Sequence, residues 1–298
     1  MKKGFTFLEL VFVIVIMGIL AKFGTNILVT TYDSYSTSTT NSKIMADVEL
    51  TLKQISNRLQ YRIKDSVIAG GAAQSLTAAP AGARLIEWIG YDVDGWLGDA
   101  ASTNPTWSGF IDLTDGNIAE LDSPGTSTAR ANTVIQALRP VGSGTHIDDV
   151  AIFFTGQNAD VTTDFGWYVA ALNSQNNVAA HKIQDNGAQV TKLVDNSGAT
   201  FAGTDIYENY KLSWTAYALS FTNLNANGVG DLFLIYDYQP WAGETIAQGT
   251  QVLLLEGVQT FRFRALGETL QVQICVNNQN SLGLNDGGYS VCEEIAIF

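Results

Sequence analysis

The chain has little charge, few cysteines and few histidines, and these shortages exclude several classes of function. Only 15% of its 298 residues are charged, and Asp and Glu outnumber Lys and Arg by 29 to 16, which gives a net charge of −13. A surface that binds nucleic acid needs concentrated Lys and Arg, so we expect no nucleic-acid partner. Two histidines leave little room for a His-based triad or a zinc centre, and neither a GxSxG nor a GxxxxGK motif occurs. We therefore expect no enzymatic activity.

What the chain has in abundance is apolar sequence at its N-terminus. A basic stub precedes an apolar run from Phe5 to Ala21, which is near the lower length limit for a spanning helix. A secretory signal has its small residues after the apolar run, where it is cut off. Here the small residue Gly4 precedes the run, so cutting there leaves the apolar segment on the mature protein. Lys2 and Lys3 favour a cytoplasmic start, with the rest of the chain outside.

Glu9 is the one interior charge of this run. A carboxylate inside a bilayer is costly and usually has a partner and a purpose. The alternative is that Glu9 sits near the headgroups and is simply solvated. No basic side chain lies within helical reach in its own helix. In a bundle of identical helices, the new amino terminus of Phe5 on one chain could meet Glu9 on the next, and this pairing counts most where water is scarce.

The stretch GFTFLELVFVIVIMGIL resembles the class III leader and anchor of type IV pilins and type II secretion pseudopilins. The resemblance covers about the first 30 residues. It implies cleavage between Gly4 and Phe5 by a prepilin peptidase, N-methylation of Phe5, and a role for Glu9 in filament assembly. One departure is that the anchor contains no proline, since the first in the chain is Pro80. Any kink that depends on proline in the family is in doubt here.

The resemblance implies a minor structural subunit of a pseudopilus or a type IV pilus. A second resemblance, to the C-terminal sheet of J-type minor pseudopilins, lies in the stretch LLLEGVQTFRFRALGETLQVQICV. The implied location is the bacterial inner membrane, with a single pass, a cytoplasmic N-terminus and a periplasmic head, and then the filament. The implied partners are other pilin or pseudopilin subunits, the prepilin peptidase, the inner-membrane assembly platform and secreted cargo. The alternative is a pilus-displayed adhesin or ligand-binding minor pilin. DNA uptake is a third hypothesis, which the negative charge disfavours.

The sequence divides into a leader (1–4), a transmembrane or filament-core helix (5–29), a continuation of that helix (30–69) and a β-rich head (70–298). From Lys43 to Val67, apolar residues recur every three or four positions and predict one buried helical stripe. The Ser- and Thr-rich residues 30–42 fit a linker or, as we prefer, a soft stretch within one helix of about 100 Å at ~1.5 Å per residue. The predicted fold class is α+β, with a long N-terminal helix packed on a mainly antiparallel sheet.

Alternating and apolar runs predict the strands of the head, and a glycine turn at 267–268 joins the last two. In TFRFRAL, Arg262 and Arg264 alternate with apolar residues, so we expect one face of that strand to be exposed to solvent. A solvated sheet face is the preferred interpretation of these arginines, and a functional patch is the alternative. The predicted strands are 150–155, 166–172, 178–184, 188–194, 214–222, 232–238, 252–255, 260–265 and 270–276.

Cys275 and Cys292 are the two cysteines, and we expect a disulfide between them, as type IV pilins often close a C-terminal loop this way. A metal site is disfavoured there because neither histidine lies near. In YDVDGWLGD, the carboxylates Asp92, Asp94 and Asp99 do not fit the spacing of an EF-hand loop. A looser calcium site remains a weak alternative to a turn in which the aspartates cap backbone amides. We expect no other cofactor.

Overall fold

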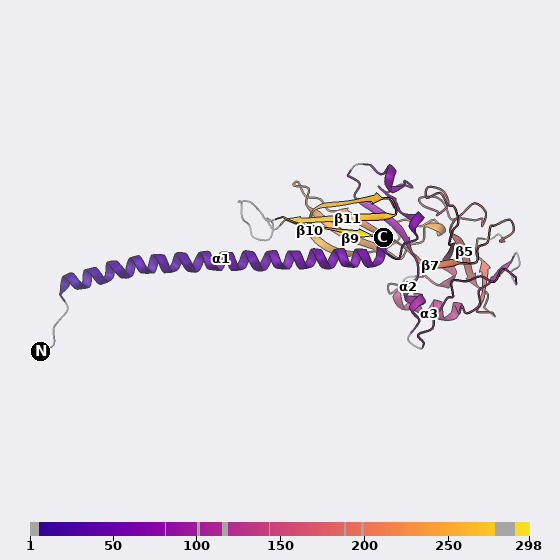
Figure 1. Cartoon of the computed structure of the whole chain (residues 1–298), viewed down its shortest axis with the longest axis horizontal. Coiled ribbons are helices and arrows are strands. Elements are labelled where there is room, and N and C mark those ends of the chain that lie inside the picture. The colour runs from indigo at the N-terminus through magenta and orange to yellow at the C-terminus, as the bar shows by residue number, and fades with distance from the viewer. Residues whose placement is uncertain are drawn as a thin grey trace.

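The computed structural model describes residues 6–80, 82–99, 102–114, 119–142, 144–187, 189–197, 200–277 and 290–298. Its first element is a 53-residue helix, α1 (Phe7–Leu59). The first half of α1 stands clear of the rest, and the second half lies along a β-rich head (Figure 1). This arrangement confirms the predicted fold class, α+β with a long N-terminal helix packed on a mainly antiparallel head.

The second half of α1 packs through the predicted apolar stripe. The strands of the head that α1 contacts include β10 (Thr250–Leu266), β11 (Thr269–Asn277) and β12 (Ser290–Ile297). Val48, Leu52, Ile55 and Leu59 are buried. These side chains recur every three or four residues and therefore share one face of the helix. The core beneath them includes Ile86, Trp88, Leu219, Leu232, Val258, Phe261, Leu270, Val272, Ile274 and Ile297.

The helix ends at Leu59, ten residues before the predicted end at Ala69. The chain leaves the helix there because its polar groups find partners in the head. The Arg62 guanidinium donates to the Glu268 carbonyl at 2.9 Å, and the Ile63 amide donates to the Ile89 carbonyl at 2.8 Å. At ~1.5 Å per residue, α1 is therefore about 80 Å long rather than about 100 Å. Residues 60–69 belong to the head.

The strands nearest α1 form one antiparallel sheet, which has seven strands within the described residues. A tight turn at Gly267 and Glu268 joins β10 to β11, and the long strand β10 bends through register shifts so that it pairs first with β9 (Gly230–Tyr236) and later with β11. The predicted strands 252–255 and 260–265 are thus parts of one strand. In spatial order the sheet contains β1 (Ile68–Ala69), β2 (Leu85–Gly90), β8 (Thr215–Thr222), β9 (Gly230–Tyr236), β10 (Thr250–Leu266), β11 (Thr269–Asn277) and β12 (Ser290–Ile297).

A second antiparallel sheet lies at the end of the head away from the start of α1 (Figure 1) and has five strands in the described part of the chain. The single residue Trp214 separates β7 of this sheet from β8 of the first. Helices α2 (Val93–Leu97) and α3 (Thr128–Leu138) lie at this end too. In spatial order the strands are β3 (Glu120–Asp122), β6 (Lys192–Asp195), β5 (His181–Asp185), β4 (Ala151–Phe154) and β7 (Tyr210–Ser213). Short 3₁₀ turns occupy Lys64–Ser66, Leu76–Ala78, Ile147–Asp149 and Pro240–Ala242.

The predicted strand 166–172 is wrong. Gly166 and Tyr168 have positive φ, of 83° and 55°, which lies outside the extended region that regular strand residues occupy. The Leu172 amide donates to the Trp241 carbonyl instead of to a neighbouring strand. The predicted strands 178–184 and 188–194 are placed correctly only in part, because β5 begins at His181 and β6 covers Lys192–Asp195.

The face of the seven-stranded sheet away from α1 is covered over β1, β2, β8 and β9. Phe165, Trp167 and Trp241 pack there on the apolar residues of these strands. Glu87 of β2, fully buried, accepts hydrogen bonds from the hydroxyls of Tyr168 and, at 3.0 Å, Tyr238. Burial raises the pKa of the Glu87 carboxyl. These bonds fix the covering segment to this half of the sheet.

Candidate functional site

The apolar first half of α1 is the largest feature that the head does not cover. Every described residue from Thr6 to Tyr35 is exposed, and Phe7 is 82% exposed. The helix is long and apolar enough to cross a membrane, and none of its most apolar window is buried in the single chain. Exposed apolar patches of more than a few hundred Å² are rare on soluble monomers and mark interaction or membrane surfaces. The exposed first half of α1 has the character of a membrane or interaction surface.

Glu9 lies in the first turn of α1, where it forms a capping box with Thr6. The amide and the hydroxyl of Thr6 each donate to Oε2 of Glu9 at 2.9 Å, and the Glu9 amide donates to the Thr6 hydroxyl at 3.4 Å. Such a box satisfies backbone donors that a helix start leaves free. Oε1 of Glu9 forms no hydrogen bond within the described residues. The carboxylate thus has one oxygen occupied by its own chain and one available.

Sequence reasoning missed the role of Thr6. The spacing Thr-x-x-Glu before an apolar run is the ordinary signal of a capping box and stands in the sequence. The two residues on either side of the expected cleavage, Gly4 and Phe5, lie outside the described residues.

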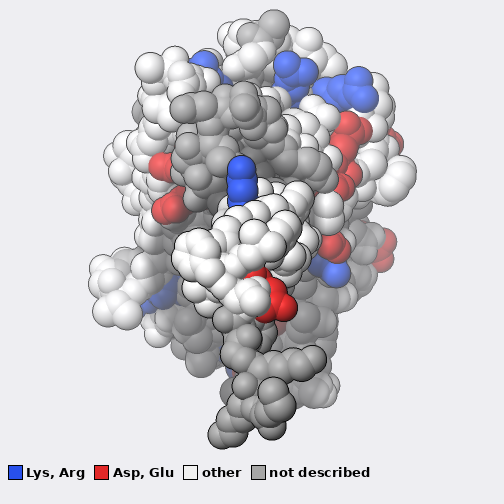
Figure 2. All heavy atoms as spheres, turned by 90° about the vertical axis from the view of Figure 1, so that its left-hand side faces the viewer, with Lys and Arg blue, Asp and Glu red and all other residues white. Residues whose placement is uncertain are grey.

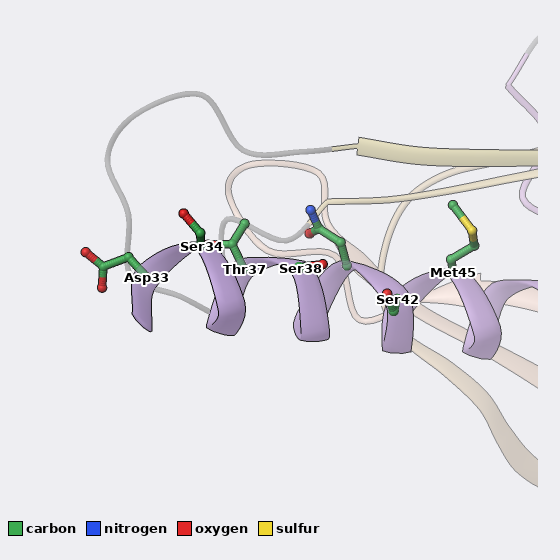
Figure 3. A pocket seen from close by; sticks show the side chains of 7 residues that line it. Asp33, Ser34, Thr37, Ser38, Ser42 and Met45 are labelled. Carbon is green, nitrogen blue, oxygen red and sulfur yellow. The ribbon is translucent and has the colours of Figure 1, made fainter. Parts of the chain in front are cut away.

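The Ser- and Thr-rich stretch continues α1 without a break, so the linker alternative for residues 30–42 is wrong. Thr25 and Thr30 turn their hydroxyls back to carbonyls of the preceding turn, at 2.9–3.1 Å. Hydroxyls that bond back in this way compete mildly with the helix ladder. Small polar side chains then follow one side of the helix and leave a shallow hollow of about 630 Å³ (Figure 3), lined by Asp33, Ser34, Thr37, Ser38, Asn41, Ser42 and Met45.

The predicted disulfide is present, and Cys275 and Cys292 lie directly opposite each other in β11 and β12. The bond joins the edge strand β12 to its neighbour. Ile295 and Ile297 of β12 face the core beneath α1. The disulfide thus holds in place the strand on which part of the helix rests.

The three aspartates considered for calcium have other roles in the structure. Oδ1 of Asp92 accepts the Gly95 amide at 3.0 Å and caps α2, and burial raises the pKa of the Asp92 carboxyl to about 6. Asp99 accepts from Arg130 at 2.7 Å and from the Ser102 amide at 2.8 Å. Asp94 lies in the first turn of α2. In the described part of the chain, no group of three or more His, Cys, Asp or Glu residues has a geometry suited to a metal ion.

The aromatic residues near these aspartates pack mainly on one another. Trp107 is buried and contacts the rings of Tyr91, Trp96 and Tyr210, with centroids 4.8–6.5 Å apart. Trp88 is fully buried under α1. Trp88 and Trp107 therefore belong to the core, whereas Trp96 keeps 43% of its surface exposed.

The chain was compared with models of protein families, with curated proteins and with solved structures, and none of them matches it.

Proposed function

We propose that this protein is a minor pilin-like subunit, held in the bacterial inner membrane by the first half of α1 and built through that helix into a pseudopilus of a type II secretion system or a type IV pilus. The observation that carries the proposal is that a bare apolar helix continues without interruption into a folded head. An anchor that served the membrane alone would not need a rigid connection to the head. A subunit that packs helix against helix in a filament needs both parts in one rod.

In this proposal a prepilin peptidase cuts between Gly4 and Phe5, and Phe5 is N-methylated. The cytoplasmic start and the periplasmic head follow from Lys2 and Lys3. Within the filament, the amino terminus of Phe5 on one copy meets Oε1 of Glu9 on the next. An ion pair of this kind is strongest in a site from which water is excluded. The inner-membrane assembly platform supplies the motion, and the head contacts neighbouring subunits or secreted cargo.

The test must separate two roles of Glu9, capping its own helix and pairing with another chain. Glu9→Gln keeps an oxygen that can accept from Thr6 and removes the charge, because glutamine also serves at this position of a capping box. Glu9→Ala removes both. A matched control is Glu49→Gln, which removes an exposed acid from the same helix within the head. We expect normal membrane insertion and cleavage for all three, and poor recovery in sheared filaments for both Glu9 variants only.

If Glu9→Gln enters filaments as well as the wild type does and only Glu9→Ala fails, capping of α1 accounts for the requirement for Glu9. The proposed ion pair between Glu9 and the neighbouring amino terminus would then be contradicted. Mass spectrometry of the mature protein tests the processing: it should find N-methylated Phe5 as the first residue. An intact Met1 or a cut after Ala21 would contradict the proposal. Labelling of intact cells with a membrane-impermeant reagent separates a secretion pseudopilus, with a protected head, from a pilus that displays the head outside.

A further inference from the structure

Among the described residues, one half of the outer face of the seven-stranded sheet is left largely exposed. The half over β1, β2, β8 and β9 carries a covering segment fixed through Glu87 and the tyrosines beside it. On β10, β11 and β12 the same face presents polar side chains, and Arg262, Arg264 and Glu294 are exposed. In Figure 2, basic side chains gather along the upper edge of the head, on the side away from α1 in Figure 1.

The exposed half of this face is hollowed. A concave site of about 650 Å³ has strand side chains as its floor, and its wall is formed by Leu76, Ala79, Pro80, Gly82 and Ala83. Leu76 and Pro80 make the wall apolar, and the polar floor is made by Arg262, Arg264, Gln271, Gln273 and Glu294. A cleft with an apolar side and a few placed polar groups is the usual form of a binding site.

The floor of the hollow is ordered by the sheet register. Arg262 lies opposite Gln273, and Arg264 lies opposite Gln271. Oε1 of Gln271 accepts from Nε of Arg264 at 2.6 Å, which holds that side chain across the strands. Arg262 and Arg264 are two residues apart on one strand, so their Cα atoms are about 7 Å apart on the same face.

Neither arginine forms an ion pair with an acidic side chain in the described part of the chain, although Glu294 of β12 lies opposite Gln273 on the same face. By contrast, Arg130 pairs with Asp99 at 2.7 Å. In a chain of net charge −13, acidic groups are plentiful, and these two guanidinium groups nevertheless face solvent. Guanidinium groups match carboxylates with two parallel hydrogen bonds.

We propose that this hollow binds an extended acidic segment of a partner protein, with two carboxylates two residues apart facing Arg262 and Arg264. An extended chain repeats every second side chain at about 7 Å, which is the spacing of the two arginines. The Gln271 and Gln273 amides are placed to bond to the backbone of such a segment. Leu76 and Pro80 contact its apolar side chains. This site lies on the head and does not depend on the proposed role of Glu9 or on filament assembly.

The test uses the full-length chain in detergent micelles and a short fluorescein-labelled peptide in which serine and glutamate alternate. Fluorescence anisotropy should show saturable binding of this peptide and none of the matched peptide with glutamine in place of glutamate. The double variant Arg262→Gln and Arg264→Gln should bind about tenfold or more weakly, because charge-assisted hydrogen bonds are lost. The double variant Lys43→Gln and Lys53→Gln removes equal charge from α1 and should bind as the wild type does.

A third double variant, Arg262→Lys and Arg264→Lys, keeps the charge and loses the planar fork, and it should bind several-fold more weakly than the wild type. Circular dichroism and reductant-free gel mobility check that each variant keeps the fold. Three results would overturn the proposal: no saturable binding by the wild type, equal binding of the glutamine peptide, or equal loss in the Lys43 and Lys53 variant. Binding by the lysine variant equal to that of the wild type would overturn the bidentate recognition.

Discussion

The Thr6 hydroxyl donates a hydrogen bond to the Glu9 carboxylate at the start of α1, with 2.9 Å between Oγ1 and Oε2. Removing the hydroxyl by Thr6→Ala should loosen the first helical turn, because capping side chains satisfy amides that have no partner within the helix. Hydrogen exchange of the first-turn amides in micelles should be several-fold faster, and exchange in the next turns should not change. Thr25→Ala is the control, since Thr25 bonds only within the helix interior. Unchanged exchange in the first turn would refute the capping role of Thr6.

Two leucines on the second half of α1 provide a matched pair for testing how the helix binds the head. Leu52 is 4% exposed in the core, whereas Leu50 is 57% exposed. Leu52→Ala should lower the free energy of unfolding of the head by about 2–5 kcal/mol, because it removes buried surface and leaves a cavity. Leu50→Ala should change it by less than about 0.5 kcal/mol. Urea unfolding in micelles, followed by tryptophan fluorescence, measures both, and equal effects would contradict the observed packing of α1.

The disulfide closes a sequence separation of 17 residues and ties β12 to β11. Replacing both Cys275 and Cys292 by serine should lower the free energy of unfolding by about 3 kcal/mol, since a loop of this length restricts the unfolded chain. Unfolding of the wild type with and without a reductant measures the same quantity. The serine variant serves as the control, because a reductant should not affect it. If a reductant also lowers the free energy of unfolding of the serine variant, the effect of the reductant does not arise from the Cys275–Cys292 disulfide.

Asp92 gives stability a pH dependence of known sign. It is 2% exposed, and burial raises its pKa from 3.8 to about 6 in the folded state. The folded protein therefore holds this proton more tightly than the unfolded chain does. The contribution of Asp92 to the free energy of unfolding is therefore fully present below about pH 4. It falls by about 3 kcal/mol in total as the pH rises to about 6. His181 acts in the opposite direction over an overlapping range, because burial lowers its pKa to about 4.

The Asp92 contribution is isolated by comparison with Asp92→Asn, which does not titrate and whose side-chain oxygen can still cap α2. The difference in free energy of unfolding between the wild type and this variant should fall between about pH 4 and pH 6. Outside that range it should be level. Urea unfolding at a series of pH values measures it, and a difference that stays level throughout would mean that Asp92 keeps its ordinary pKa.

Periodicity was enough to predict the class of fold and the buried stripe of α1, since Val48, Leu52, Ile55 and Leu59 are buried as expected. It did not predict where α1 ends, because the Ile63 amide leaves the helix for a carbonyl about 26 residues away in sequence. Nor did it predict the division of the head into two sheets, which depends on pairings between distant strands. The strand expected at 166–172 has strand-like composition, and contacts with Trp241 override it.

For the candidate site, the sequence was sufficient to locate Glu9, and the capping box with Thr6 could have been found from the same letters. The burial of Glu87 could not have been predicted from the sequence. An acid that alternates with apolar residues in a strand predicts a wet face, and here a segment about 80 residues further along the chain covers it. The assembly role of Glu9 stays a prediction.

The unbroken course of α1 has a mechanical consequence. The helix α1 is about 80 Å long, and one of its ends packs into the core of the head. No break in the helix offers a hinge between its exposed half and the head. A push or a turn applied to the exposed apolar end of α1 is transmitted along the helix to the head. Any compliance must come from the hydroxyl-rich middle of the helix, where the backbone bonds have competitors.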